Sequence, residues 1–339
     1  MLSELPDFEH VSVRQVEEAV SALRTYGDGA KVIAGGTDLL ALMKDRVQGP
    51  KLPIPKVLID IKPIEDMQRI DYERAQGLRI GAAVKIREVL DSKIIRKEFD
   101  LLSQTARTIA TTQIRNIGTV GGNLCQKSRC PYFRHPDFLC HRKGGETCFA
   151  FSGEHKQYHA VMKYGKCASA HPSDLAPCLL ALGAECVVAQ GGGREVVIPL
   201  EKFFPEGNDQ RDTVLRPDEL LVSLRVPCPA EKSYQVFLKC RTRHSADFAL
   251  ASVAVALRVV KGVCMDARIV LGGVAPFPFR AVEAEERILE RALDERLIGE
   301  ASEGSVEGVR PLPQNAYKSD LTKALVNRAL TSILHQMRM

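Results

Sequence analysis

The sequence predicts an α+β fold, in which a larger N-terminal part is followed by a separate α+β unit built on an antiparallel sheet. Three observations lead to this prediction. Helix and strand signals alternate through the N-terminal part, and long strand-like apolar segments then follow one another near the C-terminal end. The composition of the 339 residues, 45% hydrophobic and 26% charged, suits two or three globular domains.

The first segment is expected to form one helix and two short strands. Ser12 and Gln15 stand at capping-box spacing before the amphipathic stretch VRQVEEAVSALRTYG, which ends at Gly27. The apolar segments KVIAGG and VLIDI are typical of strands, and the first of them runs directly into two glycines. The sequence therefore predicts a small βαβ-like unit over about residues 1–60.

The middle of the chain continues this alternation. GLRIGAAV is a third strand candidate, helices run from there to about Ala110, and the glycine-rich IRNIGTVGGNL follows. Beyond an irregular segment, the residues HPSD (171–174) lead into the helix LAPCLLALG. ECVVAQ and REVVIPL predict a hairpin closed by three glycines, and DELLVSLRVP predicts a strand. The sequence PCP (227–229) indicates a linker, so the first domain is expected to span residues 1–227.

The remaining residues, 228–339, are expected to form the second domain. YQVFLKCRTR, ASVAVALRVV and VCMDARIVLGGV predict a three-stranded antiparallel sheet, with a turn at Lys261 and Gly262. Helical patterns follow over about residues 281–293 and 318–337.

Composition excludes several classes of function. The 47 basic and 42 acidic residues give a net charge of +5, which is too small and too evenly spread to indicate nucleic-acid binding. No run of 18 or more apolar residues is present, so no membrane contact is expected. Because no apolar signal segment opens the sequence, we expect a cytoplasmic protein, with folded export alongside a signal-bearing partner as the alternative. No nucleophile, acid or base is assigned a catalytic role.

Half of the ten cysteines lie close together in an irregular, basic segment. They are Cys125, Cys130, Cys140, Cys148 and Cys167. A disulfide framework is not expected in a chain of this length with enough hydrophobic sequence to fold unaided. Thiolates at this density indicate a metal or iron-sulfur site, and the residues alone leave a zinc ion and a cluster both open.

Two glycine loops are the other chemical signal. AGGTD (34–38) follows the first predicted strand, and GTVGGN (118–123) precedes the cysteines. Glycine permits positive φ angles and lets main-chain N–H groups approach a pyrophosphate. Neither loop matches the G-x-G-x-x-G pattern, and a lone glycine pair is usually only a turn. Together, however, the two loops predict a site for one dinucleotide.

Four motifs now point to a family. VIAGGTDLL, IRNIGTVGGNL, HPSDLAPCLLALGAE and RPDELLVSLRVP resemble, in this order, the flavoprotein or medium subunit of the molybdenum hydroxylases, the xanthine dehydrogenase and carbon monoxide dehydrogenase family. The resemblance runs over nearly the whole chain. It implies a PCMH-type FAD-binding domain with subdomains at about 1–60 and 61–227, followed by a flavoprotein C-terminal domain.

The resemblance also implies a set of FAD contacts. The pyrophosphate and adenosine are expected against the two glycine loops, with Asp174 at the adenosine end or, alternatively, acting as a helix N-cap. A lysine near the flavin ring would stabilise its anionic reduced form, whereas the aliphatic Ile109 is not expected to stack on the ring. The implied residues are Lys31, Val32, Ile33, Ala34, Gly35, Gly36, Thr37, Asp38, Ile109, Thr119, Val120, Gly121, Gly122, Asn123, Asp174, Leu221 and Lys239.

The cysteine segment, about 125–168, resembles an insertion in 4-hydroxybenzoyl-CoA reductase and the periplasmic aldehyde oxidoreductases. In those proteins the insertion holds a [4Fe-4S] cluster, and the matching ligands here are Cys130, Cys140, Cys148 and Cys167. Four thiolates complete such a cluster, so Cys125, directly after the GGN loop, is expected not to bind it. The spacing from Cys148 to Cys167 is closer to the aldehyde oxidoreductases. Arg129 or Arg142 is expected to raise the potential of this cluster.

The resemblance implies an electron-transfer subunit. Its partners would be a large molybdopterin subunit and a small subunit with two [2Fe-2S] clusters, in a heterotrimer that could dimerise, together with an external carrier such as ferredoxin. The complex would act on an aromatic thioester, an aldehyde or an N-heteroaromatic compound. The alternatives are a self-contained FAD oxidase and a zinc-bearing scaffold without redox activity.

Overall fold

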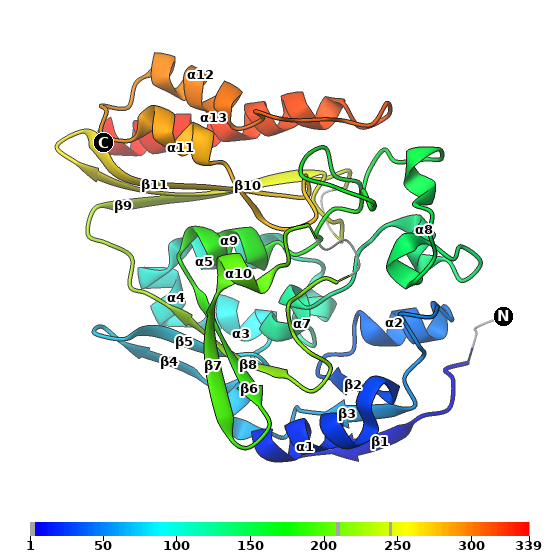
Figure 1. Cartoon of the computed structure of the whole chain (residues 1–339). Coiled ribbons are helices and arrows are strands. Elements are labelled where there is room, and N and C mark those ends of the chain that lie inside the picture. The colour runs from blue at the N-terminus through cyan, green and yellow to red at the C-terminus, as the bar shows by residue number, and fades with distance from the viewer. Residues whose placement is uncertain (1–3, 208–210, 244–245, 339) are drawn as a thin grey trace.

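Three β-sheets organise the computed structural model, which describes residues 4–207, 211–243 and 246–338 (Figure 1). Among these residues no helix is long and apolar enough to cross a membrane. The mixture of sheets and helices confirms the predicted α+β class.

The N-terminal sheet is parallel, with the strand order β1-β3-β2. Its strands are β1 (Glu9–Ser12), β2 (Ala30–Ile33) and β3 (Val57–Asp60), and its helices are α1 (Val16–Tyr26), η1 (Gly27–Gly29) and α2 (Leu39–Lys44). The βαβ prediction is confirmed, but β1 was not predicted. The capping box was assigned wrongly, because Ser12 ends β1 and it is Gln15 that pairs with Glu18 at the start of α1.

The central sheet is antiparallel, with the strand order β4-β5-β8-β6-β7. Its strands are β4 (Ile70–Glu73), β5 (Gly77–Gly81), β6 (Glu185–Gln190), β7 (Arg194–Pro199) and β8 (Leu220–Val226). The helices of this part are η2 (Glu65–Gln68), α3 (Ile86–Asp91), α4 (Lys93–Glu98), α5 (Asp100–Thr108), α6 (Thr112–Arg115), α7 (Val120–Leu124), α9 (Leu175–Ala181) and α10 (Leu200–Phe203). One hydrophobic core joins this sheet to its helices and to α1.

The C-terminal sheet is antiparallel and has the order β12-β11-β10-β9. Its strands are β9 (Ser233–Cys240), β10 (Ala251–Val260), β11 (Val263–Gly272) and β12 (Phe279–Arg280). Helices α11 (Val282–Ile288), α12 (Glu295–Gly304) and α13 (Tyr317–Arg338) cover one face, while α5 and α9 lie on the other (Figure 1). The prediction of three strands is wrong by one, because β12 has only two residues and shows no alternation of apolar and polar positions.

The cysteine segment has little regular structure. It contains the short helix α8 (Pro131–Arg134) and the 3₁₀ turns η3 (His141–Lys143) and η4 (Phe149–Phe151). The segment lies between the N-terminal part and the C-terminal sheet, as the position of α8 in Figure 1 shows. Its first residues line a cavity together with both glycine loops.

Candidate functional site

The two glycine loops lie against each other. A Cβ atom added to Gly35 would lie 2.3 Å from the main-chain oxygen of Ile117 and 3.0 Å from the Cα atom of Gly118. Gly36 follows with a φ angle of +69°, in the left-handed region that favours glycine. The loop after β2 can therefore reach the loop before α7 only because position 35 has no side chain.

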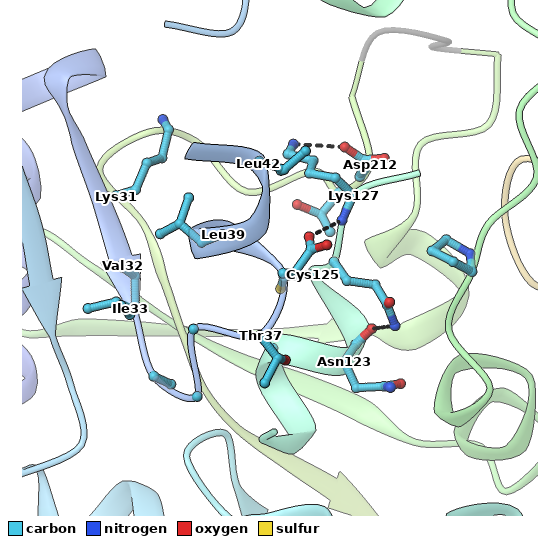
Figure 2. Close-up of a pocket in the computed structure, with 18 of the residues that line it drawn as sticks. Lys31, Val32, Ile33, Thr37, Leu39, Leu42, Asn123, Cys125, Lys127 and Asp212 are labelled. Atoms are coloured by element: carbon cyan, nitrogen blue, oxygen red, sulfur yellow. Dashed lines mark hydrogen bonds and ion pairs between the residues drawn. The ribbon is translucent and has the colours of Figure 1, made fainter. Parts of the chain in front are cut away.

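A large cavity of about 1020 Å³ opens where these loops meet (Figure 2). Its size is at the upper end of the range for small-molecule and cofactor sites. The predicted cofactor residues that line it are Lys31, Val32, Ile33, Ala34, Gly35, Gly36, Thr37, Asp38, Ile109, Thr119, Gly122, Asn123 and Asp174. The structure thus brings together residues from both loops and from the start of α9.

Four predicted cofactor residues do not line this cavity: Val120, Gly121, Leu221 and Lys239. Val120 and Leu221 are buried in the hydrophobic core. A Cβ atom at Gly121 would lie 2.8 Å from that of Ala82, so this glycine lets α7 pack closely on the chain that follows β5. Val120, Gly121 and Leu221 therefore pack inside the fold and do not face the cavity.

Lys239 forms an ion pair with Asp174 at 2.6 Å, and both side chains are buried. Burial raises the pKa of Asp174, although the lysine opposes this effect. Asp174 occupies the N-cap position of α9, yet its side chain does not cap the helix. Ser173 does so instead, since its hydroxyl oxygen accepts a hydrogen bond of 3.0 Å from the N–H group of Ala176.

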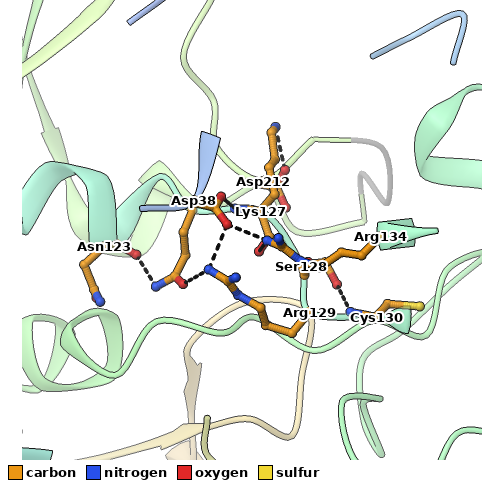
Figure 3. A network of polar contacts seen from close by, with 9 residues as sticks. Asp38, Asn123, Lys127, Ser128, Arg129, Cys130, Arg134 and Asp212 are labelled. Carbon is orange, nitrogen blue, oxygen red and sulfur yellow. Dashed lines mark hydrogen bonds and ion pairs between the residues drawn. The ribbon is translucent and has the colours of Figure 1, made fainter. Parts of the chain in front are cut away.

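Basic side chains from the cysteine segment converge on Asp38, the last residue of the first glycine loop (Figure 3). Arg129 pairs with its carboxylate at 2.8 Å, Arg134 pairs with the same oxygen, and the N–H group of Lys127 donates to the other oxygen at 2.8 Å. Burial and the neighbouring Lys127 lower the pKa of Lys31 in this part of the cavity. The result is an electropositive wall suited to a phosphate-bearing ligand.

A buried carboxylate connects this wall to the cysteines. Asp212 pairs with Lys127 at 2.7 Å through one oxygen and with Arg142 through the other. Asp212 and Arg142 are both less than 10% exposed, and these two cations hold the pKa of Asp212 below its usual range against the effect of burial.

A second, much smaller cavity is lined by four of the five clustered cysteines: Cys130, Cys140, Cys148 and Cys167. Aromatic residues, among them Tyr132 and Phe149, complete its wall. The fifth, Cys125, lines the large cavity instead, where burial raises its pKa to about 12. Within residues 4–207, 211–243 and 246–338, no group of three or more His, Cys, Asp or Glu side chains is arranged so that it could hold a metal ion.

The four thiols differ in their electrostatic environment. The pKa of Cys167 is lowered to about 5, because its sulfur accepts a hydrogen bond from Cys148 and lies beside the Arg142 guanidinium. Burial raises the pKa of Cys130 to about 12. Arg129 and Arg142 were both predicted to affect the potential of a cluster. Of the two, Arg142 contacts a cysteine, whereas Arg129 lines the large cavity.

Two family models match the chain in succession. The model described as FAD binding domain in molybdopterin dehydrogenase matches residues 6–229, and the CO dehydrogenase flavoprotein C-terminal domain matches residues 236–333. The chain belongs to the FAD-binding subunits of the molybdopterin dehydrogenases. It is thus an oxidoreductase subunit that binds FAD.

Known proteins resemble this FAD-binding subunit along almost their full length. The aldehyde oxidoreductase FAD-binding subunit PaoB of Escherichia coli K12 is 33% identical, with 95% of each chain covered. The carbon monoxide dehydrogenase medium chain of Hydrogenophaga pseudoflava is 28% identical over 96% of this chain and 97% of its own length. A solved structure of carbon monoxide dehydrogenase from that organism superimposes with a TM-score of 0.76, at 26% identity and 97% coverage of both chains.

The large cavity fits FAD. The missing Cβ atom of Gly35 lets both glycine loops meet at the wall of the cavity, where their main-chain groups can approach a pyrophosphate closely. Lys31 and Lys127 supply positive charge beside these loops. When bound, FAD exchanges electrons singly or in pairs.

Sequence reasoning missed several residues of the FAD cavity. Part of its wall comes from three loops: residues 50–55, 211–213 with 215–217, and 246–248. Arg129, beside Asp38, also lies 4.3 Å from the centre of the Phe248 ring. The basic character of the cysteine segment was a usable signal for Lys127, Arg129 and Arg134. No motif marked the other loops, since they reach the cavity only through the tertiary fold.

Proposed function

We propose that this chain is the electron-transfer subunit of a molybdenum hydroxylase-type complex, and that its inserted segment holds a [4Fe-4S] cluster in addition to the FAD. The observation that supports this proposal is the pair of neighbouring cavities. One is lined by the glycine loops and the other by four cysteines, and the ion pairs of Asp212 with Lys127 and with Arg142 connect them.

A cluster is preferred to zinc because the spacing of the four cysteines resembles the [4Fe-4S] insertion described above. The four sulfurs line one small cavity, as the ligands of either group would. Arg142 favours the thiolate form of Cys167, and thiolates are the form that binds iron. Cys130, Cys140, Cys148 and Cys167 would be the ligands.

Partners and substrate follow from the relatives. We expect a molybdopterin large subunit and a small subunit with two [2Fe-2S] clusters, with this chain passing electrons between them and an external carrier such as ferredoxin, in the cytoplasm or after folded export. An aldehyde is the favoured substrate of the complex, because the relative at 33% identity is named as part of an aldehyde oxidoreductase. An N-heteroaromatic compound or an aromatic thioester would be the alternative.

Anaerobic purification of the chain with its partners tests the proposal. We expect FAD, about four irons per copy of this chain beyond those of the small subunit, and a co-purifying molybdopterin subunit. Zinc in place of iron would contradict the cluster. Oxidation of an organic substrate by the isolated chain would instead favour a self-contained FAD oxidase.

The potential of the cluster should depend on Arg142. In Arg142→Gln the midpoint should fall by on the order of 50–100 mV, or roughly 1–2 kcal/mol. The lost positive charge contacts the ligand Cys167 and stabilises the more negative, reduced cluster. The measurement is an EPR-monitored redox titration of the purified complex. Arg129→Gln is the matched control, since Arg129 faces Asp38 and the FAD cavity. Equal shifts in the two variants would refute the special role of Arg142.

A further inference from the structure

Residues 310–318, just before and at the start of α13, form hydrogen bonds to the second half of the cysteine segment. The N–H group of Arg310 donates to the oxygen of Val161 at 2.8 Å, and Asn315 Nδ2 donates to that of Ala160 at 3.1 Å. Lys318 Nζ donates to the oxygen of His159 at 3.0 Å. The backbone around His159 is therefore fixed by the C-terminal part of the protein.

The His159 side chain points from this fixed backbone to a predicted cluster ligand. Its Nε2 atom lies 3.3 Å from the sulfur of Cys130, and the residue is only 1% exposed. The other ring nitrogen, Nδ1, has no hydrogen-bond partner within the described part of the chain. The contact to sulfur is thus the polar contact that the structure gives this buried ring.

The tautomer of His159 follows from what Cys130 would present. A cysteine bound to iron is a thiolate, which can only accept a hydrogen bond. A nitrogen lone pair facing that sulfur would be repelled, so the proton must lie on Nε2. The unpaired atom is then the Nδ1 acceptor.

We propose that His159, held in place by Lys318, donates an N–H···S hydrogen bond to Cys130 and thereby raises the potential of the cluster. This inference rests on the proposed function of the cysteine cavity. A hydrogen bond to a ligand sulfur offsets part of its negative charge, and the reduced cluster carries the larger charge, so the bond stabilises the reduced state more. His159 is a positioning and tuning residue and not a ligand.

Lys318 provides a second reason for this assignment. Its side chain is fully buried, and its ammonium group donates to the oxygens of His159 and Gly273. It forms no ion pair with a carboxylate in the described residues, and burial lowers its pKa to about 7. A buried cation is costly without a counter-charge, and a negatively charged cluster on the far side of His159 would supply one.

The test uses the purified complex, with iron and FAD contents and the cluster midpoint measured together under anaerobic conditions. His159→Phe removes the donor and should lower the midpoint while about four irons remain on this chain. His159→Gln keeps an N–H donor of similar reach and should shift the midpoint less. Lys318→Met should also lower it, because the buried positive charge is lost.

His155→Gln is the matched control. His155 lies in the same segment and contacts Gln314 and the oxygen of Ala150, and it has no hydrogen bond to a cysteine in the described part of the chain. The cluster midpoint of the His155→Gln variant should equal that of the wild type. An unchanged midpoint in His159→Phe would overturn the inference, and so would loss of iron in both His159 variants, which would make His159 a ligand. If the wild-type chain itself holds no iron, the proposed function fails, and that result is distinct from either outcome.

Discussion

Cys167→Ala should remove the proposed iron-sulfur cluster and leave FAD in place. Cys167 is the thiol whose pKa is lowered to about 5, first by the hydrogen bond from Cys148 and further by Arg142, so it is the thiolate best prepared to bind iron. Its loss leaves three thiolates for a cluster that requires four. We expect the iron bound to this chain to fall from about four atoms to nearly none. Iron analysis and the broad visible absorbance beneath the flavin bands would report the change.

Cys125→Ser is the control for this experiment. Cys125 belongs to the same segment but lines the FAD cavity, so its replacement should leave the iron content unchanged. A wild-type iron content in Cys167→Ala, or an equal loss of iron in Cys125→Ser, would contradict the assignment of the four ligands. FAD content, measured in the same samples, separates loss of the cluster from general unfolding.

Gly35→Ala should weaken FAD binding at least tenfold, which corresponds to about 1.4 kcal/mol or more. The added Cβ atom would lie 2.3 Å from the main-chain oxygen of Ile117, and a backbone atom cannot turn aside as a flexible side chain can. The two glycine loops would have to separate, which would displace the main-chain groups that we expect to face the pyrophosphate. Titration of FAD into the flavin-free chain, followed by fluorescence, would measure the change.

Gly29→Ala is the matched substitution near the start of β2. A Cβ atom at Gly29 would meet nothing within 4 Å, so this variant should bind FAD like the wild type. Thermal unfolding of both flavin-free variants shows whether the fold survives. Wild-type affinity in a folded Gly35→Ala variant would refute the role assigned to the contact between the loops.

Local patterns in the sequence predicted most of the regular elements. The 3.6-residue period of α1 and the alternating or continuous apolar runs of β6 to β11 were sufficient to locate them. Elements with weak local signals were missed, among them β1 and β4 with four residues each, β12 with two, and α12. Short edge strands are defined by pairing with distant residues, and a single sequence does not contain that information.

Some residues of the candidate site were likewise predictable from local patterns, and others were not. Glycine spacing predicted that two loops would share one ligand, and four of the five clustered cysteines do line one cavity. By contrast, Asp212 follows a segment without any motif, and its pairing with Lys127 and Arg142 depends on the tertiary fold. The resemblance predicted Lys239 beside the flavin ring. In the structure the buried Lys239 side chain forms an ion pair with the buried Asp174, a contact that no local pattern indicated.

The hydrogen bonds between His155 and Gln314 join positions 159 residues apart. They therefore limit the order in which parts of the protein can fold during synthesis. Until the ribosome has made residues 310–318, residues 155–161 lack the hydrogen bonds that these later residues provide. Both glycine loops, in contrast, have already emerged. The contacts that fix the backbone around His159 can therefore form only after the start of α13 has been made, whereas the two glycine loops can meet earlier.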